Sequence, residues 1–288
     1  MLNESFTLSN GVSIPKIGFG TWMIDDAKVA QHVRDAISVG YRHIDTAQAY
    51  ANEVGVGEGI RTSGVDRKDI FLTTKLAAEI KNYEEAVAAI DESLAKLDLD
   101  YIDLMIIHSP KPWAEFQNDD DHFFEGNLEA WRALEEAYEA GKLRAIGVSN
   151  FEQVDLENLL TNAQVKPMVN QILAHIGHTP VEVIEFSQQN NMIVEAYSPI
   201  AHGAMMQNED ITSMADKYGV SIPQLAIRYC LQLDLLPLPK TENIDHMKNN
   251  ADVDFVISAE DMTTLKNIGR VDYGDHSDIP VFRRATDK

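Results

Sequence analysis

Residues 70–107 read IFLTTKLAAEIKNYEEAVAAIDESLAKLDLDYIDLMII. The stretch opens with a short β-rich run at 70–74 and closes with a second at 102–107. Between them, residues 83–97 repeat apolar side chains at the three- and four-residue spacing of an amphipathic helix. A strand, a helix and another strand in this order are typical of the βαβ unit, in which the two strands are parallel.

The same alternation extends in both directions along the chain. The predicted strands are residues 18–21, 43–45, 70–74, 102–107, 145–148, 167–170, 193–196 and 235–238. The predicted helices are residues 26–39, 53–62, 83–97, 128–140, 152–161, 180–189, 211–218, 222–233 and 261–268. This pattern predicts a (β/α)8 TIM barrel, with a doubly wound parallel sheet as the alternative because periodicity does not show closure. No Pro/Gly/Ser-rich linker interrupts it, so we expect one domain over residues 1–288.

Ahead of the first strand, two short alternating runs at 6–8 and 12–14 flank Ser9, Asn10 and Gly11. Asn-Gly between alternating apolar residues is the strongest short signal for a β-hairpin. We expect this N-terminal hairpin to plug the bottom of the barrel.

The net charge of the chain narrows the classes of partner that we expect for it. The chain has 24 Lys and Arg residues against 46 Asp and Glu residues, for a net charge of −22. Such an acidic surface repels phosphate backbones and anionic headgroups, so nucleic acid and membranes are excluded as expected partners.

The N-terminus lacks the basic and apolar regions of a signal peptide, and we expect a cytoplasmic monomer. The single cysteine, Cys230, excludes an internal disulfide and is expected to be buried.

Four polar residues are expected at one rim of the barrel. Asp45, Lys75 and His108 follow or end predicted strands, and Tyr50 lies in the loop after Asp45. An ammonium at Lys75, paired with Asp45, is expected to lower the pKa of the Tyr50 hydroxyl, while His108 orients a carbonyl oxygen. This set suits protonation of a carbonyl oxygen. Since none of these side chains can donate hydride, a nicotinamide must carry it.

The motifs around these residues resemble a known family. Residues 40–47 (GYRHIDTA), followed by Tyr50 and residues 53–57 (EVGVG), resemble the first signature of the aldo-keto reductase family. Residues 144–151 (RAIGVSNF) resemble its second signature, and residues 168–171 and 197–199 resemble its cofactor-contacting segments. The resemblance runs from Gly20 to Lys240 and is greatest to bacterial and yeast-type reductases of small aldehydes, dicarbonyls and keto-sugars.

This resemblance implies an NADP(H)-dependent carbonyl reductase with a catalytic tetrad of Asp45, Tyr50, Lys75 and His108, in which Tyr50 is the proton donor. Ser149, Asn150 and Gln171 would hold the carboxamide, and Tyr197 would stack on the nicotinamide. The implied cofactor-binding residues are Gly20, Thr21, Trp22, Asp45, Ser149, Asn150, Gln171, Tyr197, Ser198, Pro199, Ile200, Lys240, Thr241, His246, Asn249 and Asn250. The implied substrate-binding residues are Trp22, Tyr50, His108 and Trp113.

One departure from the family concerns the cofactor. In the third family signature an Arg usually follows the Lys of Pro-Lys-Ser by six residues, and here His246 stands at that distance from Lys240. A neutral His lacks the permanent charge and bidentate fork of the Arg that would clamp the adenosine 2′-phosphate. We therefore expect NADP(H) to be preferred and NAD(H) to be accepted as well, with Lys240, Thr241 and Lys248 as the remaining phosphate partners.

A second departure concerns the substrate pocket. After His108 the family commonly has Trp-Pro, whereas this chain has Ser109 and Pro110, which should widen or wet the pocket. The long loop 111–126 that follows is expected to line the substrate site with its aromatic residues, which are Trp113, Phe116, Phe123 and Phe124.

Three other patterns are given structural roles. The glycines at 55, 57 and 59 lack the spacing of a dinucleotide-binding turn and predict tight helix packing. The acidic residues 119–121 predict solvated surface rather than a metal site. No His pair has metal-ligand spacing, so no metal is expected, although His202 is placed beside the cofactor pyrophosphate.

Two other functions compete with carbonyl reduction. The first is a Schiff-base lyase with Lys75 as nucleophile, which requires a neutral amine and is opposed by an Asp45 partner. The second is a redox sensor that binds the cofactor without turnover, which would have no need of the proton donor Tyr50.

Overall fold

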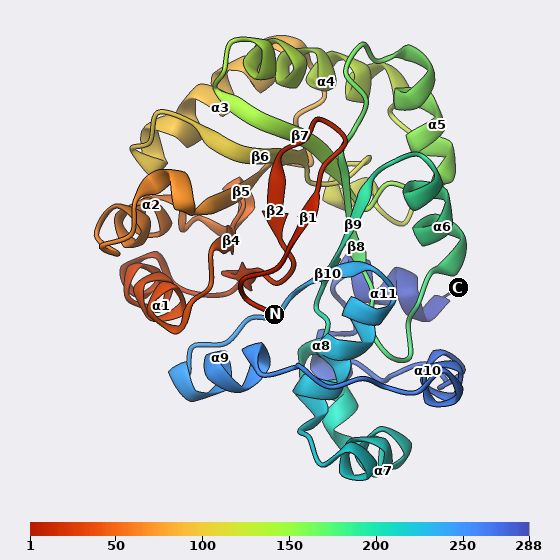
Figure 1. The fold of residues 1–288 in the computed structure, drawn as a ribbon. Coiled ribbons are helices and arrows are strands. Elements are labelled where there is room, and N and C mark those ends of the chain that lie inside the picture. The colour runs from red at the N-terminus through yellow and green to blue at the C-terminus, as the bar shows by residue number, and fades with distance from the viewer. Residues whose placement is uncertain (288) are drawn as a thin grey trace.

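The computed structural model describes residues 1–287, and its centre is a closed ring of eight parallel strands (Figure 1). The strands are β3 (Phe19–Gly20), β4 (His43–Asp45), β5 (Phe71–Leu76), β6 (Ile102–Ile107), β7 (Leu143–Ser149), β8 (Val169–Leu173), β9 (Ile193–Tyr197) and β10 (Leu235–Leu238). They follow one another around the sheet in chain order. The two end strands also meet, because the Gly18 and Gly20 N–H groups donate to the carbonyls of Pro237 (3.1 Å) and Pro239 (3.0 Å). The predicted barrel is confirmed, and the doubly wound alternative is wrong.

Helices surround the strands (Figure 1). They are α1 (Asp26–Val39), α2 (Glu53–Arg61), α3 (Tyr83–Leu97), α4 (Phe124–Glu139), α5 (Gln153–Asn162), α6 (Val181–Gln189), α7 (Glu209–Tyr218), α8 (Ile222–Gln232), α9 (Ile244–Ala251), α10 (Ala259–Lys266) and α11 (Pro280–Asp287). Two of these, α9 and α11, were not predicted, and α4 begins four residues earlier than the predicted 128–140. The other predicted helices are confirmed to within two residues at each end.

Burial on both faces explains the mostly apolar run at residues 102–107. All six residues of β6 are buried, since one face lines the barrel interior and the other contacts the helical layer. Parallel strands covered on both faces typically show this pattern instead of alternation.

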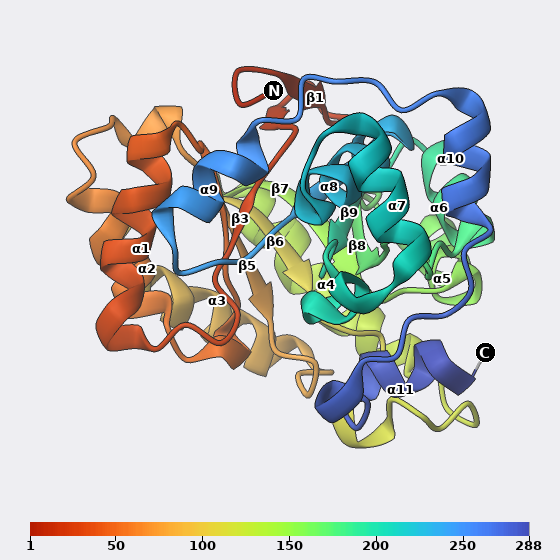
Figure 2. The same ribbon diagram turned by 90° about the horizontal axis from the view of Figure 1, so that it is seen from below.

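The N-terminal hairpin covers one end of the barrel, as predicted. Its strands, β1 (Ser5–Thr7) and β2 (Ser13–Pro15), pair antiparallel with Phe6 opposite Ile14. Ile14 is fully buried, and the Asn10 side chain donates to the Arg144 carbonyl (3.0 Å) near the start of β7. The hairpin therefore lies at the amino ends of the strands. Figure 2 shows α11 at the opposite end, where the strands finish.

The glycines of α2 serve packing, as predicted. A Cβ atom on Gly57 would lie 2.0 Å from the Leu97 carbonyl oxygen, and one on Gly55 would lie 2.4 Å from the Asp26 carbonyl oxygen. Only glycine lets α2 approach its neighbours this closely. The Cys230 thiol is buried, also as predicted.

A scan of residues 1–287 for long apolar helices finds none that could cross a lipid bilayer. In the same part of the chain, no group of three His, Cys, Asp or Glu side chains is arranged to hold a metal ion.

Candidate active site

A cleft of about 660 Å³ opens at the carboxyl ends of the strands. Most of the residues selected from the sequence line it: Gly20, Trp22, Asp45, Tyr50, His108, Trp113, Ser149, Asn150, Gln171, Tyr197, Ser198, Pro199, Ile200 and Lys240. These residues come from loops and strand ends around the whole ring. The fold therefore brings together side chains that lie up to 220 residues apart, from Gly20 to Lys240.

The Lys75 ammonium lies beneath the cleft and joins the other polar groups. It is fully buried and donates to Asp45 Oδ1 (2.6 Å), the Thr46 carbonyl (2.8 Å) and the Tyr50 hydroxyl (3.2 Å). It also lies 4.7 Å from the centre of the Tyr50 ring. These contacts use all three donors of the ammonium and hold it against the phenol from below.

The protonation states follow from burial and from these pairs. Although burial alone lowers the pKa of Lys75, the Asp45 carboxylate and the Tyr50 hydroxyl outweigh it and raise that pKa above its ordinary value. Burial raises the pKa of Tyr50, and the Lys75 ammonium, which lowers it, does not outweigh burial. The predicted net lowering of the Tyr50 pKa is therefore wrong. Lys75 acts in the expected direction, but desolvation of the phenol is the larger effect.

His108 stands beside the Tyr50 ring as a neutral imidazole. Its ring meets the Tyr50 ring edge-on at 5.8 Å and the Trp113 indole edge-on at 5.1 Å. Burial, and secondly the Lys75 ammonium, hold the pKa of His108 well below its ordinary value. A neutral imidazole carries one N–H and can donate it to an oxygen atom in the cleft.

Amides and hydroxyls form a polar wall of the cleft. The Gln171 amide nitrogen donates to Asp45 Oδ2 (2.9 Å), and the Ser149 hydroxyl donates to the Gln171 carbonyl (2.8 Å). The Tyr197 hydroxyl donates to Asn150 Oδ1 (2.6 Å), and the Asn150 amide nitrogen donates to the His108 carbonyl (3.0 Å). Each side chain is fixed by a neighbour, so the wall presents a set of oriented polar groups and one aromatic ring.

This wall fits an elongated cofactor that carries an amide at one end. Gly20 leaves a narrow passage, since a Cβ atom there would lie 3.3 Å from the Leu238 carbonyl oxygen and 3.6 Å from the Lys240 Cβ. Gly20, Lys240 and Tyr50 all line the cleft. The polar wall offers partners for a ring that carries an amide group. The Lys240 ammonium offers a partner for phosphate groups.

Beyond this passage, both lysines expected to contact phosphate already have carboxylate partners. Lys240 donates to Glu242 Oε1 (2.9 Å), and Lys248 lies 3.3 Å from Asp245 Oδ1. His246 lies in α9, and its backbone N–H donates to the capping Asn243 side chain (3.4 Å).

Five of the expected cofactor-binding residues do not line the cleft, and for them contact with a cofactor stays a prediction. Thr21 is fully buried and its hydroxyl donates to the Asp45 carbonyl (2.9 Å), so it supports the strand end instead. The others belong to the segment after β10, where Asn249 donates to the Ser221 hydroxyl (2.8 Å). They are Thr241, His246, Asn249 and Asn250.

The loop after β6 contributes less to the cleft than predicted. Of its four aromatic residues only Trp113 lines the cleft, and the prediction is wrong for Phe116, Phe123 and Phe124. Phe116 is buried under Arg284, whose guanidinium lies 5.2 Å from its ring, and Phe124 begins α4 and stacks on His122. The acidic residues 119–121 of the same loop are exposed, as predicted.

The C-terminal tail supplies four lining residues that were not selected individually from the sequence. His276, Ile279, Pro280 and Val281 all face the cleft. His202, which the sequence placed near the cofactor, lines the cleft and contacts His276 (4.8 Å between ring centres) and the edge of Trp22 (4.8 Å). No local motif in the tail marks these residues. The other missed lining residues are Met23, Ala49, Gly203, Leu238 and Pro239.

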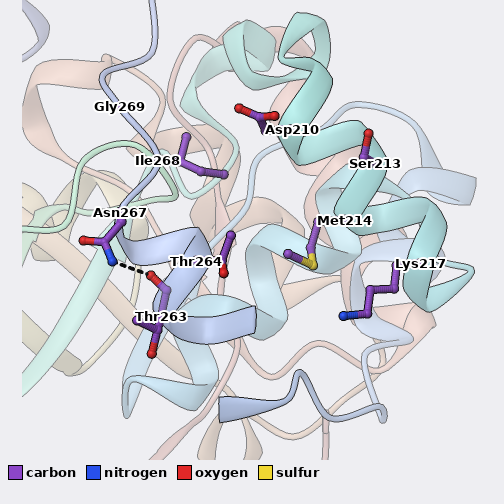
Figure 3. A pocket seen from close by; sticks show the side chains of 9 residues that line it. All are labelled: Asp210, Ser213, Met214, Lys217, Thr263, Thr264, Asn267, Ile268 and Gly269. Atoms are coloured by element: carbon purple, nitrogen blue, oxygen red, sulfur yellow. Dashed lines mark hydrogen bonds between the residues drawn. The ribbon is translucent and has the colours of Figure 1, made fainter. Parts of the chain in front are cut away.

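A second hollow lies on the outside of the molecule, between α7 and α10 (Figure 3). Its lining comes from these two helices and the chain that follows α10. The one ammonium in its lining, that of Lys217, donates to both oxygens of Asp261 (2.8 Å each). It contains none of the residues selected from the sequence, and we assign it no chemistry.

The sequence pattern of the aldo/keto reductase family matches residues 16–270. The chain belongs to this family and is an oxidoreductase.

Individual relatives agree along nearly the full length. Glyoxal reductase of Bacillus subtilis is 40% identical over 271 residues, which span 93% of this chain and 94% of that protein. A solved structure of an aldo/keto reductase from Brucella melitensis has a TM-score of 0.85 and 36% identity, covering 91% of this chain and 97% of that one. The Bombyx mori aldo-keto reductase in complex with NADP has a TM-score of 0.82 and 32% identity, covering 97% and 98%.

Proposed function

We propose that this protein reduces aldehyde and ketone carbonyls to alcohols with NADP(H), and that Tyr50 donates the proton. The observation that carries the proposal is the position of the Tyr50 hydroxyl. It lies 3.2 Å from a buried ammonium and in the same cleft as the polar wall formed by Ser149, Asn150 and Gln171.

Tyr50 is suited to act as a general acid. Because its pKa is raised, the phenol holds its proton at neutral pH and has it to give. Donation leaves a phenolate, and the adjacent Lys75 ammonium stabilises that charge in a site with little water. Asp45 keeps Lys75 protonated throughout. A neutral His108 would hold the carbonyl oxygen within reach of the phenol.

The cofactor would lie along the polar wall. When bound, NADP(H) would supply a hydride to the carbonyl carbon. Ser149, Asn150 and Gln171 would hold the carboxamide, and the Tyr197 ring would set which face of the nicotinamide is turned toward the substrate. The solved NADP complex of the Bombyx mori relative supports this choice of cofactor.

NAD(H) should be accepted as well. The 2′-phosphate would lack the guanidinium that His246 replaces, and the two nearby lysines are paired with Glu242 and Asp245. The adenosine ribose of NAD(H) carries a 2′-hydroxyl in place of the 2′-phosphate. It therefore does not compete with these carboxylates for the two lysines.

The substrates we propose are small aldehydes, dicarbonyls and keto-sugars. The lining of the cleft includes aromatic and aliphatic side chains, among them Trp22, Trp113 and Val281. The glyoxal reductase relative supports the dicarbonyl class.

We further propose that the chain acts as a monomer and folds as one domain. Light scattering on the purified protein should then give a mass near 32.2 kDa.

The geometry disfavours the lyase alternative. A Schiff-base lysine must be a neutral amine with access to substrate, whereas Lys75 is fully buried, paired with Asp45 and has a raised pKa. Borohydride trapping in the presence of a carbonyl substrate should leave Lys75 unmodified. A covalent adduct at Lys75 would replace the reductase proposal with the lyase.

The direct test is the initial rate of NADPH and NADH oxidation with a small aldehyde, a dicarbonyl and a keto-sugar. We expect turnover with NADPH on one or more of these classes, and a NADPH-to-NADH ratio of kcat/KM of about ten or less. Absence of turnover with every class would favour the redox sensor. A strict requirement for NADPH would remove the role given to His246.

A further inference from the structure

One buried carboxyl group in the barrel interior has no part in the chemistry proposed above. Glu195 lies in β9 and is fully buried. It is the register partner of Gln171 on the adjacent strand β8, so the two side chains project side by side into the barrel. Glu195 is thus placed directly behind a residue of the polar wall.

The contacts of Gln171 define the orientation of its amide. The amide nitrogen donates to Glu195 Oε2 (2.6 Å) and to Asp45 Oδ2 (2.9 Å). A glutamine amide has two N–H donors, and both are used by these carboxyl groups. Turning the amide over would break both hydrogen bonds and place its oxygen against the Asp45 carboxylate that pairs with Lys75, which is unfavourable. Asp45 therefore sets which atom is nitrogen and which is oxygen, and Glu195 accepts the second N–H.

We propose that Glu195 is a positioning residue that presents the Gln171 amide oxygen to the carboxamide NH₂ of the nicotinamide. The inference rests on the proposed function, in which Gln171 contacts that carboxamide. Asp45 alone would engage only one of the two amide hydrogens. With Glu195 the second is also engaged, and the amide oxygen is left as the group that accepts from the cofactor.

This arrangement is unfavourable for folding. Glu195 Oε1 has no hydrogen-bond partner among the residues described, and the His43 Nε2 atom lies 3.8 Å away from it. Burial, and secondly Lys75, lower the pKa of His43 to about 3, so the imidazole is neutral and does not pair with a carboxylate. Burial, and secondly Asp45, raise the pKa of Glu195 to about 8. An apolar side chain of similar size should therefore stabilise the barrel.

The opposed effects on stability and binding give a test. Glu195→Leu removes the acceptor for Gln171, whereas Glu195→Gln keeps an amide oxygen that can accept the same hydrogen bond. We expect the Kd for NADP⁺, measured by quenching of tryptophan fluorescence, to rise about tenfold in Glu195→Leu and to stay within about twofold in Glu195→Gln. The thermal midpoint of the cofactor-free Leu variant should equal or exceed that of the wild type.

A modified cofactor isolates the contact. The 3-acetylpyridine analogue of NADP⁺ carries a methyl ketone in place of the carboxamide and has no N–H to donate. Wild type and Glu195→Leu should therefore bind this analogue with equal affinity. As a matched control, Thr73→Val removes a hydroxyl that contacts His43 (2.9 Å) in the same barrel interior, and it should leave both affinities unchanged.

The outcomes separate the inference from the function on which it rests. Failure of the wild-type protein to bind NADP⁺ would overturn the proposed function itself. Wild-type binding of NADP⁺ with an unchanged Kd in Glu195→Leu would overturn only the positioning role. Equal weakening toward NADP⁺ and the acetylpyridine analogue would also overturn it, because the effect would not pass through the carboxamide.

Discussion

At the residue scale, Lys75 links the acid of the proposed reaction to the barrel interior. Its ammonium touches the Tyr50 hydroxyl on one side and Asp45 on the other, and Asp45 in turn accepts from Gln171. The proposed proton donor and the proposed carboxamide ligand are therefore connected through a single carboxylate. A change in Asp45, which contacts both Lys75 and Gln171, should therefore affect both the chemistry and the binding of the cofactor.

Glu242 is the residue at which cofactor preference should be adjustable. Its carboxylate accepts from Lys240 (2.9 Å), and this hydrogen bond lowers the pKa of Glu242. Glu242→Gln removes the negative charge and leaves Lys240 available to a 2′-phosphate. We expect the NADPH-to-NADH ratio of kcat/KM to rise about three- to tenfold, as measured by steady-state kinetics with each cofactor.

Glu4→Gln is the matched control. Glu4 pairs with Lys16 (3.0 Å) beside the N-terminal hairpin, at the other end of the barrel, and its substitution changes the net charge by the same amount. This variant should keep the wild-type ratio. Equal ratios for the Glu242→Gln variant and the wild type would show that the Lys240–Glu242 pair does not discriminate between the cofactors.

At the element scale, the tail and the loop after β6 together form one wall of the cleft. The Arg284 guanidinium donates to the Phe116 carbonyl (3.1 Å) and lies 3.1 Å from Glu152 Oε1. The Gln117 side chain donates to the Pro280 carbonyl (2.7 Å). These bonds tie α11, whose Val281 lines the cleft, to the loop that contributes Trp113 to the same lining.

Arg284→Gln should loosen this wall. We expect the KM for the carbonyl substrate to rise severalfold while the Kd for NADPH stays unchanged. The polar wall proposed to hold the cofactor comes from residues in or next to β7, β8 and β9, and not from the tail or this loop. Steady-state kinetics and fluorescence titration measure the two quantities. Arg283→Gln, which alters the neighbouring ion pair with Asp278 (2.9 Å) inside the tail, should have little effect on KM. If the two variants have the same KM, the link between tail and loop does not shape the substrate site.

Elements with strong periodicity could be predicted from the sequence, and elements defined by distant contacts could not. All eight strands were predicted because each is a short apolar run between helical segments, and the carboxyl ends of those strands then indicated Asp45, Lys75 and His108. The tail has no such pattern: His276 and Val281 reach the cleft only because the chain returns across the barrel mouth. The direction of the Tyr50 pKa shift was missed for the same reason, since desolvation depends on everything packed around the phenol.

At the scale of the whole molecule, buried histidines should make the fold sensitive to acid. Burial is the largest cause that lowers the pKa of His43, to about 3, and of His175, to about 4, against about 6.5 in an unfolded chain. The unfolded state thus takes up these protons first as the pH falls. Stability contributed by the neutral imidazoles is present above pH 6.5 and is lost between pH 6.5 and about 4.

Urea unfolding at a series of pH values tests this expectation. Each histidine should account for up to about 3 kcal/mol of the free energy of unfolding lost across this window. In His175→Gln the decline between pH 6.5 and 4 should be shallower than in the wild type, even though the variant is less stable at pH 7 through loss of the hydrogen bond to Tyr273 (2.7 Å). Parallel pH profiles would mean that His175 is not the source of the acid sensitivity.

The acidic surface and the local cations of the cleft act at different ranges. A net charge of −22 repels large polyanions, whereas a dinucleotide would meet Lys240 within a cleft at the mouth of the barrel. Global charge therefore disfavours large polyanions as partners without disfavouring a small anionic cofactor.

The central claim is that Tyr50 supplies the proton, and Tyr50→Phe tests it most directly because only the hydroxyl is removed. The measurement compares kcat for carbonyl reduction with the Kd for NADPH in the variant and in the wild type. We predict that kcat falls by about 10²–10⁴-fold while the Kd changes by less than about twofold. A variant that retains wild-type kcat would contradict the assignment of Tyr50 as the proton donor.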